Sequence, residues 1–495
     1  MKTTSREHNQ QDLERYFDQF RKNIVGVEET FHGPYGEKKI VYFDWTASGR
    51  MFHPIEDRII HTFGPYTANT HTEANITGIT MTKAYKQALH LIKRHVNAKQ
   101  TDVLVTEGSG ATGVINKFQR IIGLKIAEAY RPFIQIKKED KPVVFLTHME
   151  HHSNHISWLE TIADVVVVTP NHNGEISLKN LESSLIHFQN RKVKIGAFTA
   201  CSNVTGVVTP YHQMAKLMHQ YGGICLIDFS ASAPYIKINM HPKDKEEKLD
   251  AIVFSPHKFL GGPGASGVLI FDSSLYKNNI PDNPGGGTVT WTNPWGGRKY
   301  VDNIELKEDG GTPGFLQAIR TALAIQLKEK MGIDHILKRE KYLTSLLMKG
   351  LAGLKNVVVL DSHIKKRLGI VSFCIKNVHY NLAVKLLNDL YGIQVRGGCS
   401  CAGPYGHFLL NIDQAHSKYM TDEIDKGNLS SKPGWVRVSI HPTAREEEIQ
   451  YLLYSLTDMI QNIDRLKVDY QYNGKTNEFV HRKSKDICLD KWFEL

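Results

Sequence analysis

A lysine stands directly after a short apolar run that is typical of a buried strand. Residues 251 to 255 are apolar or small, Pro256 ends the run, and Lys258 follows within two residues. Burial favours the neutral amine, which is a nucleophile toward aldehydes. Thirty residues upstream, a second apolar run ends in the carboxylate of Asp228. A lysine for a Schiff base and an acid for a pyridinium nitrogen are the groups that pyridoxal phosphate (PLP) needs, although Lys258 taken alone also fits an exposed loop lysine.

A glycine-rich turn elsewhere in the chain has the composition of a phosphate site. Residues 107–113 read EGSGATG and stand between a predicted strand at 102–106 and a predicted helix at 114–126. Free N–H groups and the helix dipole favour an anion at such a helix start. Asn116 stands where a dinucleotide motif would have its third glycine. The turn therefore predicts a cradle for a single phosphate, with a plain tight turn as the alternative.

The elements between residues 100 and 270 are expected to place these groups side by side. Short apolar runs alternate with helical patterns there, which predicts an α/β fold with a mostly parallel sheet covered on both faces. Such sheets bind ligands at the carboxyl ends of their strands. The polar residues that follow predicted strands are His151, Asn203, Asp228 and Lys258. We expect one site at that edge.

The histidine-rich stretch at 148–152 contains residue types that bind metals, but no metal site is predicted. Two adjacent histidines do not readily share one metal face, and no second cluster supplies ligands at a recognisable spacing. An imidazole that stacks on an aromatic cofactor suits His151 better.

Composition narrows the class of protein. The 495 residues are 41% hydrophobic and 23% charged, as in ordinary globular proteins. The net charge of +10 is interspersed rather than gathered in a stripe, which argues against nucleic-acid binding. The polar N-terminus lacks a signal-peptide pattern, and no apolar run is long enough to span a membrane. Six dispersed cysteines are not typical of a disulfide framework, so a reducing cytoplasm is expected.

The rest of the chain predicts further parts. A helix is expected at 8–24, a first strand at 39–44 and a long Gly-, Pro- and Trp-rich loop at 281–314. Helices and strands after residue 320 predict a smaller C-terminal α+β domain, followed by a polar tail. The predicted division is an N-terminal helical extension, a large PLP-binding domain, a small domain and a tail, at residues 1–37, 38–318, 319–466 and 467–495.

Several stretches together resemble one enzyme family over roughly residues 38–465. They are YFDWTAS, GSGATGVIN, MEHHSNHISW, SNVTGVVTP, DAIVFSPHKFLGGPGASGVL, the GGG loop with GGTPG, VRGGCSCAG and WVRVSIHPT. In order and spacing the chain resembles class V, fold-type I PLP-dependent enzymes, and within them the cysteine desulfurase and selenocysteine lyase family.

The resemblance implies a role for each matching residue. Lys258 would carry PLP as a Schiff base, Asp228 would pair with the pyridinium nitrogen, and His151 would stack on the ring. Asn203 would contact the ring oxygen and the substrate carboxylate, which Arg437 and Arg396 would clamp. The phosphate would be held by Ser109, Ala111, Thr112, Ser255 and His257, and by Thr312 across a homodimer interface.

The resemblance also implies a reaction, in which Cys401 takes sulfur from L-cysteine and leaves L-alanine. The glycines around Cys401 allow close approach of the backbone, and Arg396 nearby favours the thiolate. A sulfur-acceptor protein would then be a partner. The family's usual glutamine three residues after the aspartate is replaced by Ala231. Two alternatives stay open: a class V aminotransferase or epimerase without a catalytic thiol, and a binding or sulfur-carrier module without turnover.

Overall fold

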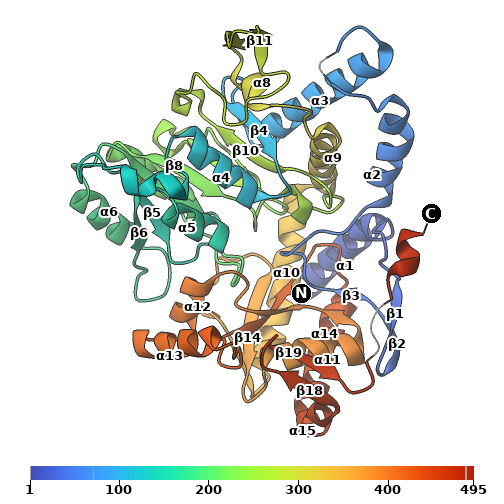
Figure 1. Cartoon of the computed structure of the whole chain (residues 1–495). Helices are drawn as coiled ribbons and strands as arrows, with labels where there is room; N and C mark the ends of the chain where they lie inside the picture. The colour runs from blue at the N-terminus through green and yellow to red at the C-terminus, as the bar shows by residue number, and fades with distance from the viewer. Residues whose placement is uncertain (1, 71, 485–487, 495) are drawn as a thin grey trace.

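A seven-stranded sheet forms the centre of the larger domain (Figure 1). The computed structural model describes residues 2–70, 72–484 and 488–494. Only β10 runs antiparallel to its neighbours, β4 and β9, while the pairs from β9 to β6 are parallel. The mostly parallel sheet predicted from the sequence is thus confirmed. In spatial order the strands are β4 (Val103–Glu107), β10 (Gly267–Phe271), β9 (Ala251–Phe254), β8 (Ile224–Asp228), β7 (Lys194–Thr199), β5 (Val143–Thr147) and β6 (Asp164–Val168).

Alternate residues of these strands enter two different cores. Phe145 and Ile227 belong to one apolar cluster, whereas Leu146 and Leu226 belong to another on the opposite face. Both faces are therefore buried, which explains why the strands are continuous apolar runs. The first cluster is covered by α6 (Leu178–His187), α7 (Tyr211–Gln220) and α9 (Phe315–Met331), and the second by α4 (Ala111–Ile121) and α5 (His152–Leu159).

The smaller C-terminal domain has its own sheet and core. Its antiparallel strands lie in the order β13 (Val357–Val359), β14 (Ile370–Ile375), β17 (Trp435–Ser439) and β16 (Arg396–Gly398). A separate apolar cluster joins this sheet to α10 (Ile333–Ala352), α11 (Tyr380–Tyr391) and α14 (Glu446–Gln461). Two further helices, α12 (Gly403–Leu409) and α13 (Gln414–Asp425), follow β16.

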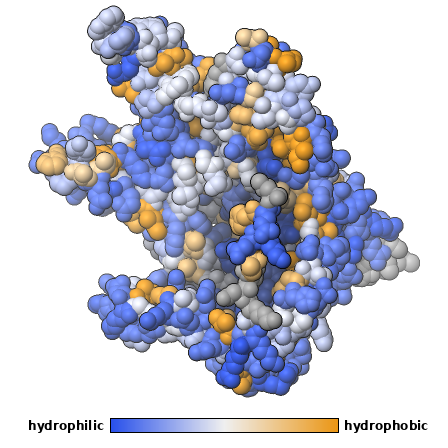
Figure 2. Space-filling model, turned by 45° about the vertical axis from the view of Figure 1, so that its right-hand side comes forward, coloured by the Kyte–Doolittle hydropathy of each residue, from blue (hydrophilic) through white to orange (hydrophobic). Residues whose placement is uncertain are grey.

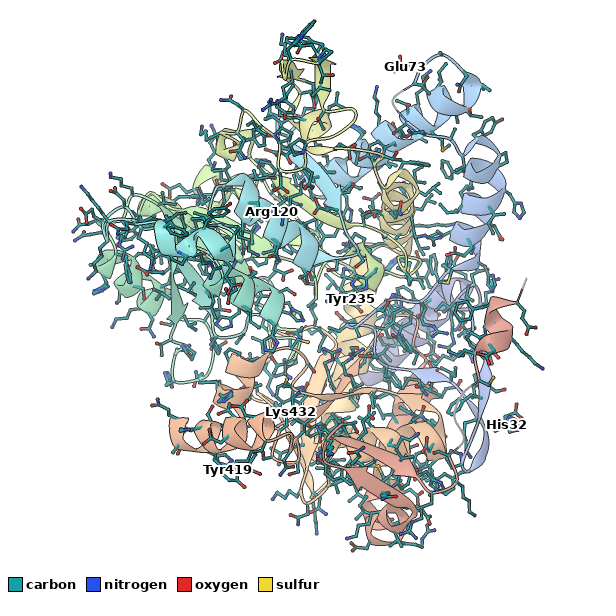
Figure 3. All side chains as sticks on the ribbon, viewed as in Figure 1. His32, Glu73, Arg120, Tyr235, Tyr419 and Lys432 are labelled. Atoms are coloured by element: carbon teal, nitrogen blue, oxygen red, sulfur yellow. The ribbon has the colours of Figure 1, made fainter. Side chains whose placement is uncertain are left out.

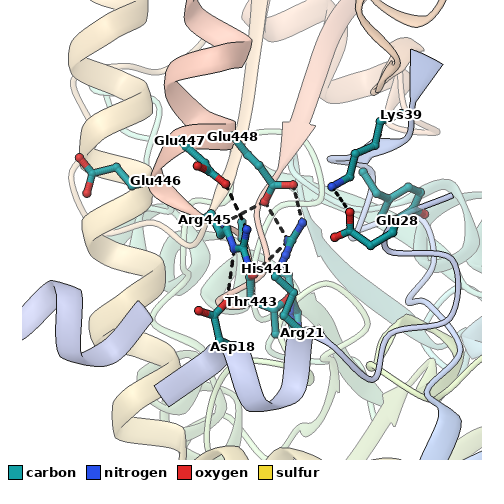
Figure 4. A network of polar contacts seen from close by, with 12 residues as sticks. Asp18, Arg21, Glu28, Lys39, His441, Thr443, Arg445, Glu446, Glu447 and Glu448 are labelled. Carbon is teal, nitrogen blue, oxygen red and sulfur yellow. Dashed lines mark hydrogen bonds and ion pairs between the residues drawn. The ribbon is translucent and has the colours of Figure 1, made fainter. Parts of the chain in front are cut away.

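The N-terminal segment packs against both domains, since Phe17 and Phe20 belong to the apolar cluster of the large sheet while Arg21 reaches the C-terminal domain. Helix α1 (Lys2–Arg21) contacts α10, and Arg21 makes two hydrogen bonds of 2.9 and 2.8 Å to the carboxylate of Glu448 on α14 (Figure 4). After the hairpin β1 (Thr30–Gly33) and β2 (Gly36–Lys39), β3 (Val41–Tyr42) pairs in parallel with β15 (Ile393–Gln394). The run predicted as one strand at 39–44 is therefore split between two pairings.

Two segments contain more structure than their sequence patterns predict. The expected loop at 281–314 contains the hairpin β11 (Val289–Thr292) and β12 (Arg298–Tyr300), and the short helix α8 (Ile304–Glu308). The expected tail contains the hairpin β18 (Tyr470–Asn473) and β19 (Glu478–His481). Tyr470 is buried, and its hydroxyl donates to Asp389 of α11 at 2.9 Å. Contacts with distant residues stabilise these short polar hairpins, and a local sequence pattern does not reveal such contacts.

The division of the chain into four parts, at residues 1–37, 38–318, 319–466 and 467–495, stays a proposal.

The face shown in Figure 2 is largely hydrophilic, with apolar side chains in small separate groups. In the described part of the chain, no helix has the length and apolar character needed to cross a membrane.

Removing Arg21 is expected to destabilise the junction of α1 with the C-terminal domain. The side chains of Arg21 and Glu448 are only 10% and 15% exposed, and breaking a buried pair leaves a charge without its partner. We expect Arg21→Ala to lower the free energy of unfolding by about 3 kcal/mol, measured by urea denaturation. The control is Arg15→Ala, because Arg15 forms an exposed pair with Asp12; its loss should cost less than about 1 kcal/mol. Equal effects would contradict the structural role of the Arg21 pair.

Candidate active site

A cavity of about 480 Å³ lies at the carboxyl edge of the seven-stranded sheet. Its volume is within the range of about 300–1,000 Å³ found for small-molecule sites. The strands β5, β7, β8 and β9 end beside it, and residues of the C-terminal domain close it. Of the predicted site residues, the cavity brings together Ser109, Ala111, Thr112, His151, Asn203, Asp228, Ser255, His257, Lys258, Arg396, Cys401 and Arg437.

Lys258 follows β9 on a single 3-10 turn, which the tight Pro256 corner begins. Burial lowers the pKa of its amine to about 8, and the positive charges of Arg437 and Arg396 act in the same direction. The negative charge of Asp228, at the end of β8, opposes them. Near neutral pH a far larger fraction of this amine is therefore neutral, and able to attack an aldehyde, than of an ordinary lysine.

Asp228 is buried, and burial raises the pKa of its carboxyl. The backbone N–H of Ser230 donates to its Oδ1 at 2.8 Å and favours the charged form. Because a buried carboxylate is costly without a partner, a cationic group within the cavity would stabilise Asp228.

His151 is held as a neutral imidazole at the start of α5. It caps that helix, since its Nδ1 accepts from the backbone N–H of Ser153 at 3.1 Å. The remaining ring proton is therefore on Nε2. Burial lowers the pKa of His151 to about 3, with the charge of Lys258 adding to the effect. A flat, uncharged ring that faces the cavity is suited to stack on an aromatic ligand.

The start of α4, where the glycine-rich turn predicts a phosphate cradle, brings hydroxyl and backbone groups together at the cavity. The backbone N–H of Ala111 donates to Ser255 Oγ at 2.9 Å, and Thr112 Oγ1 lies 2.6 Å from Ser153 Oγ. A Cβ on Gly110 would lie 3.1 Å from Ser255 Oγ and 3.5 Å from the ring of His257. The glycine thus keeps the backbone and hydroxyl donors close together at the positive end of a helix.

Two arginines from the C-terminal domain share one carboxylate. The Arg437 Nη2 donates to Asp44 Oδ1 at 3.0 Å, and the Arg396 Nε donates to Asp44 Oδ2 at 3.0 Å. Arg437 is 3% exposed and also donates to the Asn203 carbonyl oxygen at 3.0 Å. The paired guanidinium groups exceed the single carboxylate by one positive charge. The arrangement can accept one further anionic group.

Cys401 is exposed at the cavity, in a loop that Asn203 contacts. The Asn203 side-chain amide donates to the Ser400 carbonyl oxygen at 2.7 Å. Ser400 and Cys401 both adopt left-handed backbone conformations, with φ of 52° and 55°, which costs about 1–2 kcal/mol per residue outside glycine. Cys201 also lines the cavity, but burial raises the pKa of its thiol, so it stays protonated. Cys401 is the accessible thiol of the two.

The residues present fit PLP. A buried carboxylate and a partly neutral amine face the same cavity, next to a helix start with backbone and hydroxyl donors. Within the described residues, Asn203 Oδ1 and Arg437 Nε are buried and have no hydrogen-bond partner in the protein. A buried acceptor and a buried charged donor that lack hydrogen-bond partners in the protein indicate that a ligand completes the site.

Thr312 is the one predicted site residue that this cavity does not include. It is exposed and lines a neighbouring cavity of about 770 Å³ together with Ser109 and His257. The two cavities meet at Ser109 and His257, beside the predicted phosphate cradle. Within its own chain, Thr312 is therefore outside the candidate site.

Sequence reasoning assigned no role to three residues that shape the site. Asp44 belongs to the quoted YFDWTAS stretch, yet nothing local shows that it meets arginines about 350 and 390 residues later. Glu150 is buried and accepts from the Thr199 backbone N–H at 2.9 Å, which links the ends of β5 and β7; burial raises its pKa to about 7. His152 contacts the Cys401 loop directly. In the sequence, only the position of His152 within the MEHHSN stretch pointed to a role at the site.

Comparison with known proteins assigns the family. The Aminotransferase class-V model matches residues 41–452, and the chain belongs to this family. It is 29% identical over 374 residues to a probable cysteine desulfurase of Halalkalibacterium halodurans, covering 75% of this chain and 86% of that protein. A probable cysteine desulfurase of Staphylococcus aureus is 28% identical over 377 residues, covering 75% and 85%.

Solved structures share the fold. The apo cysteine desulfurase of Thermococcus onnurineus superimposes with a TM-score of 0.72 at 23% identity, covering 90% of this chain and 98% of that one. The cysteine desulfurase CsdA of Escherichia coli gives a TM-score of 0.68 at 21% identity over the same shares. The predicted architecture, a large α/β domain with a smaller C-terminal domain, is confirmed.

The reactivity of Lys258 is expected to follow its lowered pKa. Reductive methylation with formaldehyde, read by mass spectrometry of the Lys258 peptide, should rise with a midpoint near pH 8, because only the neutral amine reacts. Asp228→Asn should move the midpoint lower by removing a negative charge, and Arg437→Gln should move it higher by removing a positive one. A midpoint at the ordinary lysine value of 10.5 would show that the amine is not buried.

Proposed function

We propose that this chain is a PLP-dependent cysteine desulfurase, which takes sulfur from L-cysteine to give L-alanine and a persulfide on Cys401. One observation carries the proposal: a single cavity joins a buried lysine of lowered pKa, a buried carboxylate, two arginines and an accessible thiol. Membership of the class-V family and similarity to probable cysteine desulfurases support it.

The proposed cofactor residues surround the cavity on the side of the large domain. Lys258 holds PLP through its amine, Asp228 pairs with the pyridinium nitrogen, and His151 stacks on the ring. When bound, PLP supplies an electron sink for charge that develops at the substrate Cα. The phosphate is bound at the start of α4 by Ser109, Ala111, Thr112, Ser255 and His257.

The proposed substrate residues come mainly from the C-terminal domain. Arg437 and Arg396 bind the carboxylate of the amino acid, while the unpaired Asn203 Oδ1 accepts a hydrogen bond from a donor group of the ligand. Because Asp44 already neutralises one guanidinium, the pair carries a single net positive charge toward the ligand. That charge suits an amino acid with one carboxylate.

Three chemical steps are assigned to the chain's own groups. The Lys258 Nζ removes the proton from the substrate Cα. The Cys401 thiolate attacks the substrate sulfur, so that an S–S bond forms while the Cβ–S bond breaks and its electron pair passes to the carbon skeleton. Protonation of Cβ and Cα then yields L-alanine. The persulfide sulfur passes to an acceptor, which we propose to be a sulfur-carrier protein.

The first arm of the test concerns the cofactor. Wild-type protein supplied with PLP should develop visible absorbance and retain the cofactor covalently after borohydride reduction. Lys258→Ala should lose the covalent adduct completely, because its side chain has no amine. Covalent trapping by Lys258→Ala would refute the assignment, and absence of any PLP signal in the wild type would favour a binding module without turnover.

The second arm concerns the reaction. In a single turnover with L-cysteine, the wild type should form one persulfide and release alanine, whereas Cys401→Ser should form no persulfide and release alanine at least about 100-fold more slowly. Cys201→Ser is the matched control, since the Cys201 thiol is buried in the same cavity. If Cys401→Ser turns over an amino acid as fast as the wild type, the aminotransferase or epimerase alternative is correct.

We also propose a homodimer in which Thr312 of the partner subunit binds the phosphate. The exposed position of Thr312, in a cavity that shares Ser109 and His257 with the candidate site, supports it. Sedimentation is expected to show a dimer. Thr312→Ala should weaken PLP retention about tenfold, as expected for loss of a hydrogen bond to a charged group. A monomer that binds PLP at full strength would contradict this assembly.

A further inference from the structure

The loop that carries Cys401 has an unusual backbone. Ser400 and Cys401 are consecutive non-glycine residues in the left-handed region, with φ of 52° and 55°. Such conformations persist only where the surrounding structure enforces them, and they gather at functional sites. The groups that hold this loop therefore determine where the thiol lies.

His152 holds the loop on both sides of Cys401. Its backbone N–H donates to the Cys401 carbonyl oxygen at 2.8 Å, and its imidazole Nε2 accepts from the Gly403 N–H at 2.9 Å. The first contact uses an N–H at the start of α5 that has no acceptor within the helix. One residue thus spans the thiol-bearing residue through two hydrogen bonds.

The support beneath His152 is rigid. Within α5, Asn154 is fully buried, and its side-chain amide donates to Glu150 at 2.8 Å and to the Ala197 carbonyl oxygen at 3.1 Å. Beyond the loop, Tyr405 is fully buried and its hydroxyl lies 3.0 Å from Thr205 Oγ1. Both ends of the contact are therefore fixed by the core, and His151, the residue next to His152, faces the cavity.

The contact with Gly403 requires a particular form of the imidazole. Because Nε2 accepts a hydrogen bond, its lone pair must be free and the ring proton must be on Nδ1. The charged group that acts on His152 is Lys432, on the C-terminal side of the domain junction (Figure 3). Two titratable neighbours on its own segment, His151 and His155, are themselves affected by His152. Burial and the Lys432 charge lower the pKa of His152, which keeps the ring neutral.

We propose that His152 is a positioning residue, which holds the Cys401 loop so that the thiol faces the substrate beside Arg396 and Arg437. We call the two hydrogen bonds from His152 to the Cys401 loop the clamp. The inference rests on the proposed function only for the role of the thiol, because the clamp concerns the position of the loop alone. Cys401 is close enough to both arginines for a thiolate to raise their pKa, so a displaced loop would separate the nucleophile from the substrate site.

Two isosteric variants separate the clamp from a general packing role. In His152→Gln the side-chain oxygen takes about the position of Nε2 and can accept from Gly403, whereas in His152→Asn the shorter side chain reaches only about as far as Nδ1. Both keep the backbone contact to Cys401. Hydrogen–deuterium exchange of the Gly403 amide reports the clamp, and persulfide formation in a single turnover reports its effect on the thiol.

For His152→Asn we expect Gly403 exchange at least tenfold faster and persulfide formation at least tenfold slower, with the PLP absorbance and the KM for cysteine unchanged. His152→Gln should restore both rates to within about threefold of the wild type. Unchanged exchange in His152→Asn, or equal rates in both variants, would overturn the clamp. Altered exchange in a protein whose wild type forms no persulfide would instead reject the proposed function and leave the clamp standing.

If His152→Asn does not fold, the wild type provides the decisive measurement. In ¹⁵N spectra of histidine-labelled protein, the His152 ring, assigned by its loss in His152→Gln, should carry its proton on Nδ1. A proton on Nε2 would exclude acceptance from Gly403 and overturn the proposal.

Discussion

The site depends on one desolvated charge, the guanidinium of Arg437. This side chain belongs to the C-terminal sheet, but its hydrogen-bond partners are Asp44, near the start of the chain, and the Asn203 carbonyl oxygen, after β7 of the large domain. A buried cation without partners would be strongly destabilising. The two domains and the N-terminal segment are therefore joined at the point where the cavity forms.

Burial divides the groups of the site into neutral and charged sets. The amine of Lys258 and the rings of His151 and His257 have lowered pKa values of about 8, 3 and 4. The arginines keep their charge, because a guanidinium does not lose its proton in proteins. A nucleophile whose pKa is close to neutral thus lies beside cations that attract an anion, a combination suited to amino-acid chemistry on a carbonyl cofactor.

The segments outside the family match add contacts to the C-terminal domain. The family match begins at residue 41 and ends at residue 452. Before it, α1 packs on α10 and pairs Arg21 with Glu448. After it, the β18–β19 hairpin buries Tyr470 against α11. Because this domain supplies Arg396, Arg437 and Cys401, these additions support the side of the cavity that it contributes. The large domain supplies the opposite side of the cavity, where Asp228 and Lys258 follow buried strands.

The sequence by itself determined the architecture of the larger domain and the residues that gather at its strand ends. Buried parallel strands need continuous apolar runs, and their carboxyl ends converge, so Asp228 and Lys258 were predictable as neighbours. Only the tertiary structure decided that Asp44 joins Arg396 to Arg437, that Thr312 lies outside its own chain's cavity, and that His152 spans Cys401. These contacts join residues up to 393 positions apart. Local patterns report burial and turn preferences, whereas the meeting of distant charges depends on how whole elements pack.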